Sequence, residues 1–255
     1  MSGYDYYIGA DLGQVNDYTA IAVAEEPVWI GDPPSSPYGL NEAALWPADR
    51  RGWVAPSDLV RAQAEHFRYL TYAGERPHRP PLYLRHLERL RHTSYSVIVQ
   101  KVVDLVRRPP LADARVALLV DHSGVGRAVF DQMQVIGLRP IGITITGGTD
   151  VAVGTHGGWN VPKRDLITST QMMLQDSRLR IASGLPDAAT LTKELLDYRV
   201  KISQTGHDSY DAREGQHDDM VLAVSLICWF RDFYFKLYDA RAERNREDER
   251  MEAYR

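Results

Sequence analysis

Near its start, this 255-residue chain carries the apolar run Tyr6-Tyr7-Ile8-Gly9-Ala10-Asp11-Leu12-Gly13. After a short polar turn comes a second run, Tyr18-Thr19-Ala20-Ile21-Ala22-Val23-Ala24. Two runs of β-branched and aromatic residues separated by a turn predict a β-hairpin. The first run ends on Asp11, although aspartate is a poor strand former. Taken alone, Asp11 is explained most simply as a turn residue that bonds backbone amides. Our working hypothesis is that it is an active-site carboxylate on a rigid strand.

The composition is that of an ordinary globular protein, with 44% hydrophobic and 25% charged residues. A net charge of -4 gives no overall attraction to nucleic acid, although a local basic face would suffice for binding. The single cysteine, Cys228, lies in an apolar run, and we expect a packed core thiol. The sequence shows no secretory signal and no apolar run of membrane-spanning length. We therefore expect no membrane association and a cytoplasmic location.

The sequence predicts one domain over residues 1–238, followed by a charged helical tail over 239–255. Dense proline marks about 25–81 as an insertion made largely of extended loop. The tail alternates Arg and Glu, whose i,i+4 pairs support a solvated helix.

Strands and helices are expected to alternate after the insertion. Alternating or fully apolar runs predict strands at about 81–90, 116–121 and 140–146. Helical spacing occurs at about 94–106, 127–136, 162–174 and 187–196. Residues 149–161, rich in Gly and Thr, are expected to form a mobile loop. A second hairpin is predicted over 198–212.

Further carboxylates stand at two places where strands or helices begin or end. Asp121 ends an apolar strand and precedes a Gly-rich turn into a helix, a layout typical of an α/β active-site edge. Asp218 and Asp219 open a helix with almost no polar face. Asp121 could merely order its turn, and Asp218 or Asp219 could merely cap the helix. Buried acids, however, need partners, protons or metal ions. If these acids meet Asp11, two Mg²⁺ or Mn²⁺ ions would relieve their repulsion and could support phosphodiester cleavage.

Several cations are candidate contacts to nucleic acid, because Lys and Arg neutralise phosphates. Lys163 and Arg164 begin a predicted helix, where they oppose the helix dipole and so do not serve helix stability. Simple surface exposure explains them about equally well. The candidates are Lys163, Arg164, Arg199 and Lys201, with Arg85, Arg89 and Arg91 as further possibilities.

Four motifs follow one another along the chain: Ile8-Gly9-Ala10-Asp11-Leu12-Gly13 with Asp17-Tyr18-Thr19-Ala20-Ile21-Ala22-Val23, then Val120-Asp121-His122-Ser123-Gly124-Val125-Gly126, then Val161-Pro162-Lys163, and His217-Asp218-Asp219-Met220-Val221-Leu222-Ala223. In this order they resemble the nuclease domain of phage terminase large subunits, and the similarity covers most of residues 4–235. The resemblance implies an α/β ribonuclease H-like fold: a central mixed five-stranded sheet, its first three strands antiparallel, flanked by helices.

The resemblance also implies an activity and a site. It implies a metal-dependent endonuclease that cuts concatemeric double-stranded viral DNA during genome packaging. Asp11, Asp121 and one or both of Asp218 and Asp219 would be the catalytic metal ligands. The implied cofactors are two Mg²⁺ or Mn²⁺ ions, and the implied partners are a packaging ATPase domain or subunit, a small terminase and a portal. In that family the hairpin matching 198–212 lies near the active site and is thought to help engage DNA.

Alternatives remain open at this point. The chain lacks the G-x-x-x-x-G-K-[ST] loop of a packaging ATPase, so it would be an isolated domain, a separate nuclease subunit or a relative with another role. A junction-resolving or repair nuclease of the same fold would prefer branched DNA. An inactive DNA-binding or assembly module would keep the fold without cleavage. A sugar-kinase or actin-like ATPase also begins with a strand followed by Asp-x-Gly, but it needs two such domains.

Overall fold

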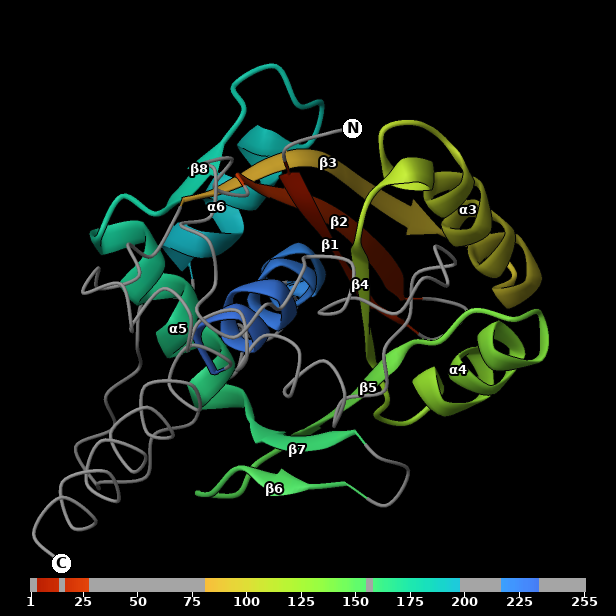
Figure 1. Ribbon diagram of the computed structural model, residues 1–255. Helices are drawn as coiled ribbons and strands as arrows, with labels where there is room; N and C mark the ends of the chain where they lie inside the picture. Colours follow the sequence, from red (N-terminus) through yellow and green to blue (C-terminus); the bar gives the residue numbers. More distant parts are fainter. Residues whose placement is uncertain (1–3, 14–16, 28–80, 155–157, 198–216, 234–255) are drawn as a thin grey trace, which may run out of the picture.

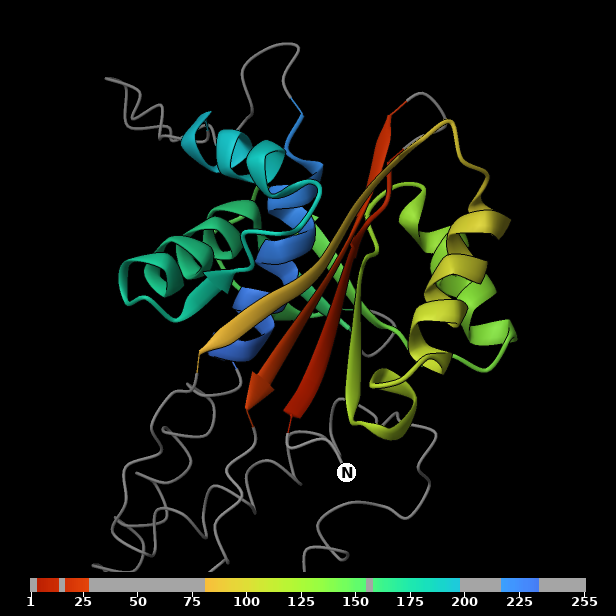
Figure 2. The ribbon, with the colours of Figure 1, turned by 90° about the horizontal axis from the view of Figure 1, so that it is seen from above.

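The computed structural model describes residues 4–13, 17–27, 81–154, 158–197 and 217–233. They form a mixed α/β fold around an eight-stranded sheet with the order β6-β7-β5-β4-β1-β2-β3-β8. Helices cover both faces of this sheet (Figure 1). Seen from above, α3 and α4 lie on one side, whereas α5, α6 and a last helix, drawn in blue, lie on the other (Figure 2).

The centre of the sheet has the predicted order and directions. Strands β1 (Tyr4–Asp11), β2 (Tyr18–Pro27) and β3 (Leu82–Arg91) are consecutive and antiparallel. On the other side of β1, β4 (Val116–Asp121) and then β5 (Ile141–Thr146) continue the sheet in parallel. The prediction of a mixed sheet whose first three strands are antiparallel is therefore confirmed.

Three short strands extend these five to eight. Strand β7 (Trp159–Pro162) pairs with β5, β6 (Ala152–Val153) pairs with β7, and β8 (Leu179–Ile181) pairs with β3. The expectation of a mobile loop over 149–161 was wrong, because that segment contains β6 and β7. The physical reason is that Val161 is fully buried in the core, and the strand that carries it covers the free edge of β5.

The helices lie where helical spacing predicted them, within a residue or two of the expected ends. Their bounds are α3 (Tyr95–Arg107), α4 (Gly126–Val135), α5 (Lys163–Gln175) and α6 (Ala188–Asp197), with a 3₁₀ turn, η1 (Leu111–Asp113), after α3. Pro162 immediately precedes α5 instead of occupying its first turn. A last helix runs over 219–233. No helix among the described residues is both long and apolar enough to cross a membrane.

Strand β2 extends into the first residues of the predicted proline-rich insertion. Strand β2 continues through Pro27, and it buries Glu25 and Glu26 against arginines: Glu25 pairs with Arg85, and Glu26 pairs with Arg231. The remainder of the predicted insertion, the predicted hairpin over 198–212 and the predicted tail over 239–255 lie outside the described residues.

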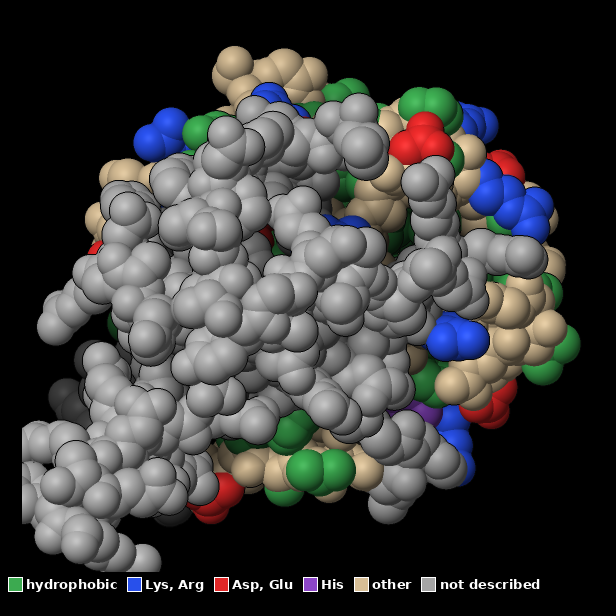
Figure 3. Space-filling model, viewed as in Figure 1, with side chains coloured by type: hydrophobic (Ala, Val, Ile, Leu, Met, Phe, Trp, Pro, Cys, Tyr) green, Lys and Arg blue, Asp and Glu red, His purple; other side chains and the backbone are tan. Residues whose placement is uncertain are grey.

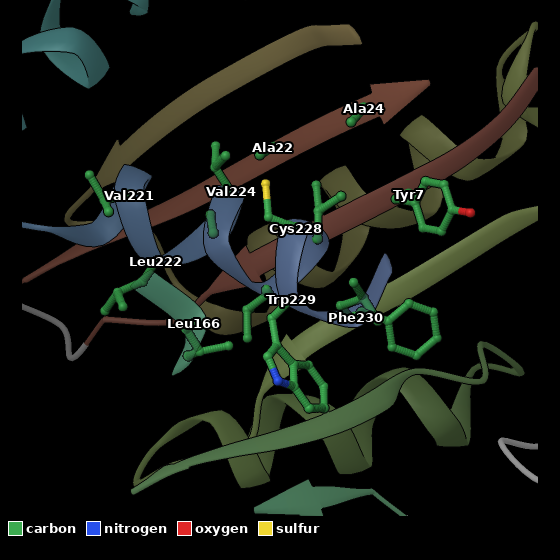
Figure 4. Packing of buried hydrophobic residues seen from close by; sticks show 14 of the residues in the cluster. Tyr7, Ala22, Ala24, Leu166, Val221, Leu222, Val224, Cys228, Trp229 and Phe230 are labelled. Atoms are coloured by element: carbon green, nitrogen blue, oxygen red, sulfur yellow. The ribbon is translucent and has the colours of Figure 1, made fainter. Parts of the chain in front are cut away.

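The 219–233 helix packs directly on the middle of the sheet. Every described residue from Asp219 to Asp232 is buried, and small alanines at 20, 22 and 24 on β2 let the helix approach. The contact with β1 is closer still: a Cβ on Gly9 would stand 2.0 Å from the carbonyl oxygen of Ala223. Figure 4 shows this helix between the two strands and α5. Cys228 lies in the same cluster, and burial raises the pKa of its thiol to about 12, as expected of a core residue.

Alternation along the strands decides which side chains meet the 219–233 helix. On β1, Tyr6, Ile8 and Ala10 pack toward α3 and α4, whereas Tyr7 packs toward the 219–233 helix. Asp11 has the same parity as Tyr7. It therefore lies on the face of the sheet that the 219–233 helix covers.

Candidate metal centre

Asp11 and Asp121 end two adjacent parallel strands. The last paired residues of β1 and β4 are Ala10 and Val120. Asp11 directly follows Ala10, and Asp121 directly follows Val120. Asp121 has the same parity as Leu119, which packs in the cluster beneath the 219–233 helix. Both aspartates are buried, at 7% and 8% exposure. The sheet thus places two carboxylates next to each other on one face, in nearly water-free surroundings.

The acids of the last helix meet this pair. Asp219 is the first helical residue, and the carbonyl of Asp218 accepts the amide of Leu222 at 2.8 Å, which starts the helical bonding. The close approach of Gly9 to Ala223 fixes the beginning of the helix over the end of β1. The structure therefore brings together all four aspartates that the sequence singled out.

Electrostatics confirm that these carboxylates act on one another. Burial raises the pKa of Asp11 well above its usual value, and the charges of Asp121, Asp219 and Asp218 raise it further. Burial also raises the pKa of Asp121, opposed by hydrogen bonds that include those from Ser123. Burial raises the pKa of Asp219, opposed by a hydrogen bond from Arg89. Such crowding favours either protons or cations at the site.

Asp121 is held in place by the Gly-rich turn that follows it. The backbone amide of Ser123 donates to Asp121 Oδ1 at 2.8 Å, and Ser123 Oγ accepts the amide of Ile145 at 2.9 Å. A Cβ on Gly126 would stand 1.9 Å from the carbonyl oxygen of Asp121, so α4 begins tightly against the strand end. The turn-ordering explanation of Asp121 is thus correct as far as it goes, and it leaves the carboxylate fixed beside Asp11.

Lys163 reaches the acids, but Arg164 does not. Lys163 Nζ lies 2.8 Å from Asp218 Oδ2, and both side chains are partly buried. Arg164 instead donates to the carbonyl of Thr149 at 2.6 Å and pairs with Asp165 at 3.2 Å. Of the other candidate DNA contacts, Arg199 and Lys201 lie outside the described residues.

Arg89, predicted from the sequence only as a possible DNA contact, lies within the site. Its Nη2 donates to Asp219 Oδ2 at 3.0 Å, and its Nη1 lies 3.5 Å from Glu194 Oε1. Glu194, on α6, is buried, and burial raises its pKa to about 7. No motif or unusual spacing marked Glu194 in the sequence, because it occupies an ordinary position of an amphipathic helix.

A second group of ligand atoms lies at the rim of the site. Asp17, His217 and Asp219 each contribute one ligand atom, and these three atoms lie within 4.8 Å of one another. They are close enough for one metal ion to contact all three. His217 Nδ1 stands 3.4 Å from Asp17 Oδ1 and 3.9 Å from Asp219 Oδ2. Asp17 and His217 are exposed, and Arg89 already occupies Asp219 Oδ2. Asp17 and His217 belong to the first and last of the four sequence motifs, but no spacing or pattern there marked them as partners of the acids.

Solved structures of phage terminase nucleases share this fold. The large terminase nuclease from thermophilic phage G20c with bound magnesium matches with a TM-score of 0.50 and 17% identity, over 89% of this chain and 82% of that chain. The chain has the fold of a large terminase nuclease domain. The large terminase nuclease domain of P22 matches with a TM-score of 0.47 and 13% identity, over 91% of this chain and 84% of that one. No protein-family model and no curated protein sequence matches the chain.

The chemistry of the site suits a hard divalent cation. The four aspartates offer only carboxylate oxygens, the ligands that Mg²⁺ and Mn²⁺ prefer. Lys163 and Arg89 neutralise the two helix acids, whereas the like charge between Asp11 and Asp121 is left for a proton or a cation to relieve. The residues present therefore fit a bound divalent cation.

Proposed function

We propose that the chain is a metal-dependent DNA endonuclease that cleaves concatemeric viral DNA during genome packaging. Asp11, Asp121, Asp218 and Asp219 would hold two Mg²⁺ or Mn²⁺ ions. The observation that carries the proposal is the gathering of four aspartates at the end of β1 and β4, where burial and then the charges of the other three acids raise the pKa of Asp11 well above its usual value. Such crowding costs stability, and strongly perturbed groups concentrate at functional sites. The likeness in fold to a phage terminase nuclease solved with bound magnesium supports the same use here.

Two cations held in this way would activate a water and stabilise the leaving oxygen of a phosphodiester. The protein supplies the rigid support. Asp11 and Asp121 project from paired strands, and the amide of Ser123 fixes the orientation of Asp121. Because carboxylates bind cations in the ionised form, cation binding releases the protons that the raised pKa values retain.

Lys163 is the described cation best placed to meet the DNA backbone. It stands beside Asp218 and is 23% exposed, so it can contact both the site and solvent. On the visible face over α3 and α4, Lys and Arg side chains are interspersed with acidic and hydrophobic ones (Figure 3). We therefore assign phosphate contact to the surroundings of the site rather than to that face.

Double-stranded DNA would be the substrate. A packaging ATPase domain or subunit, a small terminase and a portal would be the partners that deliver it. We expect these partners because the proposed role is genome packaging.

Plasmid cleavage tests the proposal directly. Wild type, Asp11→Asn and Asp121→Asn are assayed with Mn²⁺, with Mg²⁺ and with a chelator. Asp104→Asn is the matched control, since Asp104 lies on α3, on the opposite face of the sheet. We expect cleavage by wild type and the control, and near-complete loss in both site variants, because the ligands act as a unit. Equal activity in all four proteins would contradict the proposal.

The same assay separates the packaging role from the junction-resolving alternative. A packaging nuclease is expected to cut linear and supercoiled duplex DNA. A strong preference for four-way junctions over linear duplex would instead indicate a junction-resolving enzyme.

A further inference from the structure

We infer that Arg89 is a positioning residue for the metal centre and that Glu194 anchors it. In this arrangement Arg89 holds one oxygen of the Asp219 carboxylate so that the other is presented to a divalent cation. The inference rests on the proposed function and names the residues that set the geometry of one of its ligands.

The contacts of Arg89 fix its guanidinium from three sides. Nη2 donates to Asp219 Oδ2 at 3.0 Å, Nη1 faces Glu194 Oε1 at 3.5 Å, and Cζ lies 3.7 Å from the centroid of the Tyr18 ring. The side chain is 16% exposed. A planar guanidinium that is hydrogen-bonded to one carboxylate, ion-paired with a second and placed over an aromatic ring has little freedom to rotate, so it orients the Asp219 carboxylate.

Glu194 connects the same arginine to the backbone of the 219–233 helix. Its Oε2 accepts the amide of Val221 at 3.3 Å, in the first turn of that helix. This amide is one of those left without a partner inside a helix, so a carboxylate there stabilises the helix start. Arg89 and Glu194 therefore hold both the Asp219 side chain and the backbone turn that carries it.

Three elements from distant parts of the sequence meet in this contact. Arg89 comes from β3, Glu194 from α6, and Asp219 from the last helix; Arg89 and Asp219 are 130 residues apart. Metal ligands are commonly oriented by such an outer layer of hydrogen-bonding residues, whose removal costs about 10–100-fold in metal affinity or activity. The contact has the form expected of that layer.

Simple charge neutralisation is the competing explanation, and it predicts the opposite effect. A cation near the site repels a divalent ion, so removing the charge of Arg89 would strengthen metal binding if charge were its whole contribution. Positioning predicts weaker binding. The two explanations also differ for Arg89→Lys, which keeps the charge but cannot bond two carboxylates with one planar group.

Calorimetric titration of Mn²⁺ into the protein without DNA separates these cases. The proteins are wild type, Arg89→Lys, Arg89→Gln and Glu194→Gln. Arg85→Gln is the matched control, because Arg85 lies on the same strand and pairs with Glu25, away from the four aspartates. We expect Mn²⁺ affinity to fall at least about 10-fold in both Arg89 variants, to fall less in Glu194→Gln, and to change by no more than about twofold in the control.

Unchanged or tighter Mn²⁺ binding by Arg89→Lys and Arg89→Gln would overturn the inference, as would a wild type that binds no Mn²⁺. Circular dichroism establishes that each variant is folded, and Arg89→Lys decides alone if Arg89→Gln fails to fold. The nuclease proposal fails separately. Mn²⁺ binding that depends on Arg89, with no plasmid cleavage by wild type, would support the positioning role and contradict the nuclease. Cleavage by wild type, with Mn²⁺ binding independent of Arg89, would support the nuclease proposal and contradict the positioning role of Arg89.

Discussion

Asp11 and Asp121 lie next to each other at the carboxyl ends of adjacent parallel strands, one residue beyond the paired Ala10 and Val120. Both are buried, and burial raises the pKa of each; the charge of Asp121 raises the pKa of Asp11 further, so ionising both acids carries an electrostatic cost. Strand pairing holds them there whatever that cost, because a shift of register would turn every side chain of β1 to the other face. The sheet thus stores an unfavourable interaction that a bound cation can relieve.

Neutralising one member of the pair should stabilise the metal-free protein. Asp11→Asn keeps the size of the side chain and removes the repulsion from Asp121, Asp218 and Asp219. We expect a gain of about 1 kcal/mol in the free energy of unfolding, or about 2–4 °C in melting temperature, together with loss of cleavage. Thermal unfolding in a chelator measures the gain. A lower melting temperature for Asp11→Asn would show that Asp11 serves the fold rather than the site.

Stability of the metal-free protein should rise as pH falls from 8 to 5. The pKa values of Asp11, Asp121 and Asp219 are raised in the folded state, and that of Glu194 is raised from 4.5 to about 7. The folded protein therefore binds more protons than the unfolded chain in this range, so raising the pH through these values removes stability.

Glu194 accounts for a separable part of this dependence. Its own contribution is present below pH 4.5 and is lost as pH rises to about 7, so Glu194→Gln should flatten the profile between these values. Denaturant unfolding at a series of pH values, with a chelator present, measures both profiles. Superimposable profiles for wild type and Glu194→Gln would contradict the assignment.

Gly9→Ala should displace the 219–233 helix from the sheet. The added Cβ would meet the carbonyl oxygen of Ala223 at 2.0 Å, and backbone cannot move aside as a side chain can. We expect a loss of about 3 kcal/mol or more, with loss of Mn²⁺ binding, because the helix carries Asp218 and Asp219. Gly147→Ala is the control, since a Cβ there meets no atom within 4 Å. Equal unfolding midpoints for the two variants in denaturant would refute the close approach.

Lys163 and Arg164 should separate in function although they are neighbours in sequence. Lys163→Gln removes the partner of Asp218 at the site, whereas Arg164→Gln removes contacts to Thr149 and Asp165. We expect cleavage to fall at least about 10-fold for Lys163→Gln and to change by less than about twofold for Arg164→Gln. Initial cleavage rates at two salt concentrations provide the measurement. The reverse order of effects would show that Arg164 is the residue that engages DNA.

The sequence predicted the fold well wherever local pattern and burial agree. Strand β4 is apolar up to Asp121 at its end, and the 219–233 helix is apolar on nearly every side. The type and position of both elements could therefore be predicted from the sequence. The strands within residues 152–162 could not be predicted in this way, because β6 and β7 are short and depend on pairing, β7 with β5 and β6 with β7. Such pairing is a tertiary effect that no local propensity encodes.

The site could also be predicted where its residues interrupt a local sequence pattern, and could not be predicted where it depends on tertiary contacts. Aspartates at the ends of buried elements break the apolar pattern, so Asp11, Asp121, Asp218 and Asp219 stood out. Glu194 breaks no such pattern, because glutamates are common on amphipathic helices. Only the fold shows that this one is buried. Arg89 was visible only as one arginine among several on its strand. Its contact with Asp219 depends on how β3, α6 and the last helix meet.

Anomalous diffraction from crystals soaked in Mn²⁺ would show directly which residues bind the metal ions. We expect Mn²⁺ bound by Asp11 and Asp121, with Asp218 or Asp219 completing the ligands, at carboxylate distances of about 2.0–2.2 Å. Mn²⁺ bound solely at the rim, by Asp17 and His217, with none between Asp11 and Asp121, would contradict it.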